Sequence, residues 1–136
     1  MTDEDLPASD LPELSDAETE AVHSVELGLE WLQRAHGDLV EFHHKTGHAM
    51  DRLDEAESQL RDCGHEEFAD LLRREYLAAG VVDERWTYDL LERFEEGFLG
   101  DLTGFRQRVC EEITDGQRHV AERRQHREWT RRANEE

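Results

Sequence analysis

A row of apolar residues with an alternating spacing of three and four positions is the feature that most restricts the fold of this chain. The row consists of Val22, Val25, Leu29, Leu32, Leu39, Met50, Leu53 and Leu60. This spacing places its members on one face of an α-helix, as in a coiled coil or a long bundle helix. The phase is not reset at Gly37 or Gly47, so the apolar row predicts one helix over about 16–62, bent near one of these glycines.

The chain before this helix has a different composition. Residues 1–15 contain both prolines and five acidic residues but no basic residue, which predicts an acidic tail that is disordered or loosely docked. Ser15 or Asp16 can cap the helix, and Glu18 is placed for a capping box with Ser15.

Glycine and aspartate signals divide the rest of the chain into further helices. These signals are Gly64, Gly80, Asp83, Gly97, Gly100 and Asp101. Glycine commonly ends a helix, and aspartate commonly caps the next one. The sequence therefore predicts an all-α antiparallel helical bundle in a single domain over 16–136. Its two long outer helices would span about 16–62 and 101–133, and its two short helices about 65–79 and 83–98.

The charge of the chain is strongly unbalanced. It has 35 acidic and 16 basic residues, a formal net charge of −19, and Lys45 is its only lysine. Self-repulsion of this size destabilises a compact state at low salt, and multimolar salt screens it. The composition resembles that of cytoplasmic proteins of salt-accumulating halophilic archaea, with an acidic mesophilic protein or a partly disordered chain as the alternative. Since no leader and no membrane-spanning run is visible, we expect a soluble, cytoplasmic protein.

Polar residues interrupt the interface expected between the two long helices. If short turns make these helices antiparallel, residue numbers at one level sum to about 163, so position 43 faces about 120 and position 36 faces about 127. His36, His43, Glu112, His119 and His126 then lie at or near this interface. One interpretation is a metal site of His43 and His119, with His36, His126 or Glu112 as further ligands and a divalent transition metal as the cofactor. The alternative is a polar layer in which the histidines hydrogen-bond one another, Thr46 or water.

The first helix also carries a cluster of histidines and acidic residues, and the chain has two cysteines. Glu41, His44, His48, Asp51 and Glu55 share one outward face of the first helix, which predicts a solvated surface or, alternatively, a bound divalent ion. Cys63 and Cys110 have no metal-binding spacing, so we expect free buried thiols.

The stretch 118–132 contains six arginines, two glutamates and Trp129. A basic helix of this kind can bind the phosphates of a nucleic acid. The competing interpretation pairs these arginines with the acidic start of the first helix, and the high negative charge elsewhere would repel nucleic acid.

The predicted helix lengths suggest an assembly. The two short helices would cover the first helix only from about residue 46 to 62, which leaves part of the apolar row beside one neighbour. The residues expected at a homodimer interface are Val22, Val25, Leu29, Leu32 and Leu39. A break at Gly37 that folds the chain into a monomeric five-helix bundle is the alternative. Because no catalytic motif is complete, we expect a non-enzymatic assembly or partner-binding module.

Overall fold

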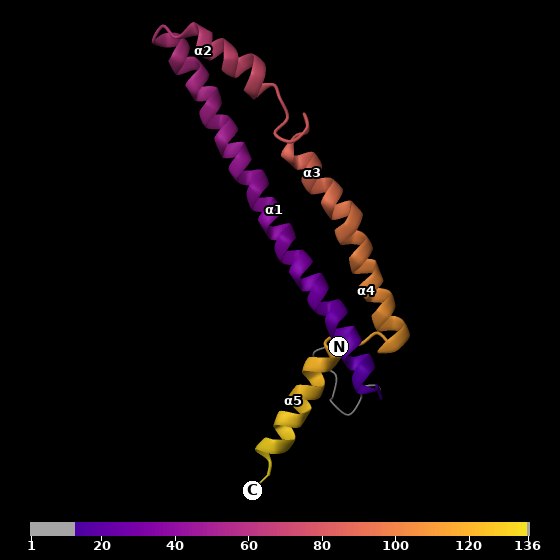
Figure 1. Cartoon of the computed structure of the whole chain (residues 1–136). Helices are drawn as coiled ribbons and strands as arrows, with labels where there is room; N and C mark the ends of the chain where they lie inside the picture. Colours follow the sequence, from indigo (N-terminus) through magenta and orange to yellow (C-terminus); the bar gives the residue numbers. More distant parts are fainter. Residues whose placement is uncertain (1–12, 136) are drawn as a thin grey trace. The chain divides into compact units, whose positions relative to one another are not determined.

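The computed structural model describes residues 13–135, and it is all-α, as the sequence predicted. The elements are α1 (Asp16–Asp62), α2 (Glu66–Leu71), the π-helix η3 (Leu72–Leu77), α3 (Thr87–Phe94), the π-helix η4 (Glu95–Leu99), α4 (Gly100–Ile113) and α5 (Val120–Ala133) (Figure 1). Within the described range there is no strand, only an isolated bridge between Val82 and Arg85. The predicted tail over 1–15 lies mostly outside the described residues.

Helix α1 is continuous through Gly37 and Gly47, which confirms the prediction from the apolar row. Its start is a complete capping box. The backbone N–H of Ser15 donates to Oε1 of Glu18 at 3.0 Å, and the backbone N–H of Glu18 donates to Oγ of Ser15 at 3.0 Å. Together these bonds satisfy two donors at the helix entrance.

The end of α1 is also the predicted one. Gly64 adopts φ +90, a conformation that glycine reaches without strain. The backbone N–H of His65 bonds to the carbonyl of Leu60 at 2.8 Å, and that of Gly64 to the carbonyl of Arg61 at 3.2 Å. This pair of bonds is a Schellman motif, which satisfies the last carbonyls of the helix.

The predicted boundary between the third and fourth helices is a kink and not a loop. Gly97 has non-helical dihedral angles (φ −89, ψ −108) within η4, and the helices before and after it follow one another directly from Thr87 to Ile113. The break comes later, where Asp115, Gly116 and His119 all have positive φ. The second long helix is therefore 87–113, and the helix predicted over 101–133 is divided into α4 and α5.

Asp83 was predicted to cap the third helix, but it does not. Asp83 and Glu84 both have positive φ (50 and 60) between the bridged residues Val82 and Arg85, so they form a tight hairpin turn. The N-cap of α3 is Trp86, which makes no side-chain capping bond. A Cβ on Gly80 would lie 2.0 Å from the backbone carbon of Glu84, so this turn requires glycine at position 80.

The described residues belong to two compact units. Among them, 13–33 and 99–135 belong to unit 1, and Arg34–Phe98 form unit 2. The expected single domain over 16–136 stays a prediction. None of the helices described in 13–135 is long and apolar enough to cross a membrane.

Candidate functional site

In unit 2, His36 and His43 meet residues of α3 and η4. Nδ1 of His43 lies 2.7 Å from Oγ1 of Thr87, a residue only 6% exposed. Nε2 of His36 lies 2.9 Å from Oε1 of Glu95, and its ring stacks on Phe94 with centroids 6.0 Å apart. Residue numbers at one level of unit 2 therefore sum to about 130 and not to the expected 163. The pairs Arg61–Asp70, Glu57–Arg73, His43–Thr87 and His36–Glu95 all fit this sum, so the turn between η3 and α3 does not reverse the chain.

In unit 1, Glu26 of α1 holds the start of α5. The backbone N–H of His119 donates to Oε2 of Glu26 at 3.0 Å, and Nδ1 of His119 lies 3.3 Å from the same oxygen. His119 is the N-cap of α5 in a left-handed conformation and provides no side-chain cap of its own. A carboxylate at a helix N-terminus interacts favourably with the exposed N–H groups and the helix dipole. Glu26 therefore replaces the missing cap.

Three further contacts join α5 to the first turns of α1. Arg124 bonds Oγ1 of Thr19 and pairs with Asp16 at 3.2 Å, and His23 lies 3.2 Å from Glu122. These contacts agree with the expectation that arginines of 118–132 pair with the acidic start of the first helix. Two other arginines of this segment, Arg131 and Arg132, pair with Glu128 of the same helix.

The Glu26 carboxylate is also a buried charge. Glu26 is 7% exposed, and no hydrogen-bond partner for its Oε1 occurs among the described residues. Burial raises the pKa of the nearby Cys110 thiol, and the negative charge of Glu26 raises it further. Cys110 is 1% exposed and free as predicted, whereas the free thiol of Cys63 is exposed and not buried as expected.

The metal-site residues are distributed over both units. His36 and His43 lie in unit 2, and Glu112, His119 and His126 in unit 1. His126 is exposed, and exposed Glu112 pairs with Arg108 at 3.5 Å. Across residues 13–135, no group of three or more His, Cys, Asp or Glu has the geometry to hold a metal ion. The site of His43 and His119 joins residues of the two units and stays a prediction.

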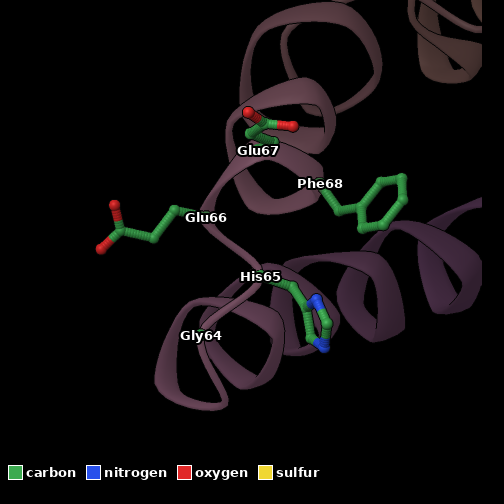
Figure 2. A pocket seen from close by; sticks show the side chains of 5 residues that line it. All are labelled: Gly64, His65, Glu66, Glu67 and Phe68. Atoms are coloured by element: carbon green, nitrogen blue, oxygen red, sulfur yellow. The ribbon is translucent and has the colours of Figure 1, made fainter.

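Two of the hollows in unit 2 are lined by histidines. One, of about 390 Å³, lies at the turn into α2. There the side chains of His65 and Phe68 extend to the same side and Glu66 points away (Figure 2). The other, of about 250 Å³, is lined by His43, His44, Gly47, His48 and Asp51, part of the outward face predicted from the sequence. Both are open to solvent, and neither gathers a set of ligands.

Exposed aromatic side chains are the feature that sequence reasoning missed. The chain has three Trp, two Tyr and five Phe. Nine of these ten are exposed: Trp31, Phe42, Phe68, Tyr76, Trp86, Tyr88, Phe98, Phe105 and Trp129. Phe94 is half-buried. The helical spacing of five of them predicts buried helix faces, but the structure exposes all five: Phe68, Tyr76, Trp86, Phe98 and Phe105.

The predicted interface residues differ in exposure. Val22 and Leu29 are 1% and 3% exposed in the single chain, whereas Val25, Leu32 and Leu39 are half-buried. The first pair is covered by the chain itself and is not available to a second copy. No protein-family model, curated protein or solved structure matches this chain at a significant level.

Proposed function

We propose that this protein is a non-enzymatic assembly module that forms homodimers in the cytoplasm of a halophilic cell. The exposure of nine of its ten aromatic side chains supports this proposal. Apolar surface in water costs about 25 cal/mol per Å². Aromatic side chains are enriched at protein–protein interfaces.

The composition is consistent with the same proposal. Two copies with a net charge of −19 each repel one another at low salt. In multimolar KCl the Debye length falls to about 3 Å or less, and apolar contacts can then hold the copies together. We therefore expect the association to weaken as salt is removed.

Sedimentation velocity of the full chain in multimolar KCl tests the proposal. We expect a concentration-dependent shift from the 15.9 kDa monomer to a species of about twice that mass. A monomer at every concentration up to the high micromolar range would reject homodimerisation.

Two alternative functions stay predictions. Metal analysis of protein purified without chelator or affinity tag tests the histidine site, because stoichiometric metal that is lost in His43→Ala would support it. Retention on immobilised DNA or RNA tests the arginine segment. Retention that is unchanged by Arg123→Glu and Arg124→Glu would reject this segment as the binding site.

A further inference from the structure

The break between α4 and α5 interrupts a row of residues whose helical spacing continues on both sides of it. The row consists of Leu102, Phe105, Val109, Ile113, Gly116 and Val120. At 3.6 residues per turn, all six lie within about 80° of one another around a helix axis. The sequence therefore favours one continuous helix from α4 through α5, whereas the structure divides it at residues 114–119, which we call the hinge.

The hinge has a strained backbone. Asp115 and His119 have φ of 54 and 59, and Gly116 has φ of 84. This left-handed conformation is disfavoured for residues with a side chain and open to glycine. The backbone N–H groups of Thr114 and Gly116 share the carbonyl of Cys110, at 3.0 and 2.7 Å. A continuous helix needs neither the left-handed residues nor the shared carbonyl.

Contacts with α1 hold α5 in the divided form. Glu26, which is 7% exposed, accepts a hydrogen bond from the backbone N–H of His119 at 3.0 Å. Val120, the first residue of α5, is 0% exposed. Further along α5, Arg124 pairs with Asp16 at 3.2 Å. These contacts offset the strain of the hinge.

The contact of Glu26 with His119 is incompatible with a continuous helix. In such a helix the backbone N–H of His119 bonds the carbonyl four residues earlier, so it no longer reaches Glu26. Oε1 of Glu26 already has no hydrogen-bond partner among the described residues, and a buried carboxylate that loses a donor is destabilised. Glu26 therefore stabilises the divided form and not the continuous helix.

We propose that the hinge is a conformational switch between the divided form and a continuous helix of α4 and α5, and that Glu26 holds it in the divided form. Hinges in proteins are a few residues at the ends of elements that absorb a large change in φ and ψ. The continuous helix removes the start of α5 from Glu26 and uncovers Val120, an apolar side chain that the divided form buries. All of these residues belong to unit 1, and the switch does not depend on the proposed dimer.

Substitution of two left-handed glycines tests the switch. Gly116→Ala disfavours the divided form, because alanine is strained at φ 84, and it favours a helix, because alanine has the higher helix propensity. Gly64→Ala is the matched control, since Gly64 has φ 90 and lies in unit 2. At both positions a Cβ would meet no atom within 4 Å among its described surroundings.

Hydrogen exchange and circular dichroism of the full chain in multimolar KCl provide the measurement. We expect Gly116→Ala to slow the exchange of the hinge amides about tenfold, because they enter helical hydrogen bonds, and to raise the helicity. Gly64→Ala should do neither. Faster or unchanged exchange of the hinge in folded Gly116→Ala would overturn the switch.

Removal of the Glu26 carboxylate is a second, independent test, and it decides the question if Gly116→Ala does not fold. Glu26→Leu removes the acceptor and keeps a side chain of similar size. Glu57→Leu is the matched control, because Glu57 is another carboxylate of α1 at 7% exposure, in unit 2. We expect slower exchange of the hinge in Glu26→Leu and unchanged exchange of the hinge in Glu57→Leu. A purely stabilising role of Glu26 predicts faster exchange of the hinge, and that result would overturn its assignment to the switch.

Discussion

The two units of this protein bury apolar residues to very different extents. Of the five buried apolar residues in the described range 13–135, unit 1 holds four: Val22, Leu29, Cys110 and Val120. Among the described residues of unit 2, only Ala69 is both apolar and buried, although this unit contains six of the nine exposed aromatic side chains. Unit 1 therefore has a small apolar core, whereas unit 2 depends more on polar contacts between its helices.

Those polar contacts are specific. Glu57, 7% exposed, accepts hydrogen bonds from Arg73 and lies 3.8 Å from Arg61, which in turn bonds Asp70 at 3.0 Å. His43 and His36 add the links to Thr87 and Glu95. Unit 2 also contains η3 and the positive-φ turn at Asp83 and Glu84. Few buried apolar contacts and irregular backbone are features of regions that open at low free energy. The two units therefore differ in their contacts: unit 1 buries apolar side chains, whereas unit 2 relies on hydrogen bonds and ion pairs and leaves six aromatic side chains exposed.

Salt removal should have the largest effect. When KCl falls from multimolar to about 0.1 M, the Debye length grows to about 10 Å and the net charge acts across the molecule. We expect loss of helicity by circular dichroism, and hydrogen exchange should show unit 2 opening before unit 1. An unchanged thermal midpoint would contradict the halophile interpretation, and simultaneous opening would contradict the difference between the units.

Substitutions of two leucines on α1 compare a buried position of unit 1 with an exposed position of unit 2. Leu29→Ala removes a side chain that is 3% exposed, and we expect it to lower the free energy of unfolding by about 2–5 kcal/mol. Leu53→Ala, at 36% exposure, is the control and should cost about 1 kcal/mol or less in the monomer. Urea denaturation in high KCl measures both values. Equal losses of unfolding free energy in the two variants would show that the two positions do not differ in packing.

The sequence predicted the features of α1 that depend on local signals. Its apolar row, the capping box of Ser15 and Glu18, and the end at Gly64 all involve residues within one or two helical turns. The Asp115–Gly116 pair was a local turn signal too, but the apolar spacing from Leu102 to Val120 runs across it and suggested a continuous helix. No glycine marks the hairpin turn at Asp83 and Glu84, so its positive φ values could not be expected.

The partners of the histidines could not be predicted because they depend on the turn between η3 and α3. Since this turn does not reverse the chain, Thr87 and Glu95 come opposite His43 and His36. The cap that Glu26 provides for α5 joins residues 93 positions apart, and no local pattern indicates it. The exposure of the aromatic residues likewise depends on which helices pack together.

Loss of the Glu57 carboxylate should have a smaller effect than loss of Leu29. The hydrogen bond from Arg73 to Glu57 raises the pKa of the Arg73 guanidinium. We expect Glu57→Gln to lower the free energy of unfolding by about 1–3 kcal/mol, because a buried hydrogen-bonded charge is removed. Asp70→Asn, at a carboxylate that is 45% exposed, is the control and should cost less than about 1 kcal/mol. If Glu57→Gln left the free energy of unfolding unchanged, unit 2 would not depend on these contacts.

The smallest effect concerns the two thiols, one in each unit. Burial, and then the charge of Glu26, raises the pKa of Cys110, so folding favours its neutral form. The unfolded chain begins to ionise this thiol near the ordinary pKa of about 8.5, where the folded protein still holds the proton. The stabilising contribution is therefore complete below about pH 8.5 and is lost as the pH rises through the folded pKa. We expect the unfolding free energy of Cys110→Ala to fall less steeply with pH in this range than that of the wild type.

A thiol reagent at pH 8 should modify the exposed Cys63 rapidly and Cys110 only after unfolding. Equal rates in the folded protein would mean that the core of unit 1 opens as readily as the surface of unit 2.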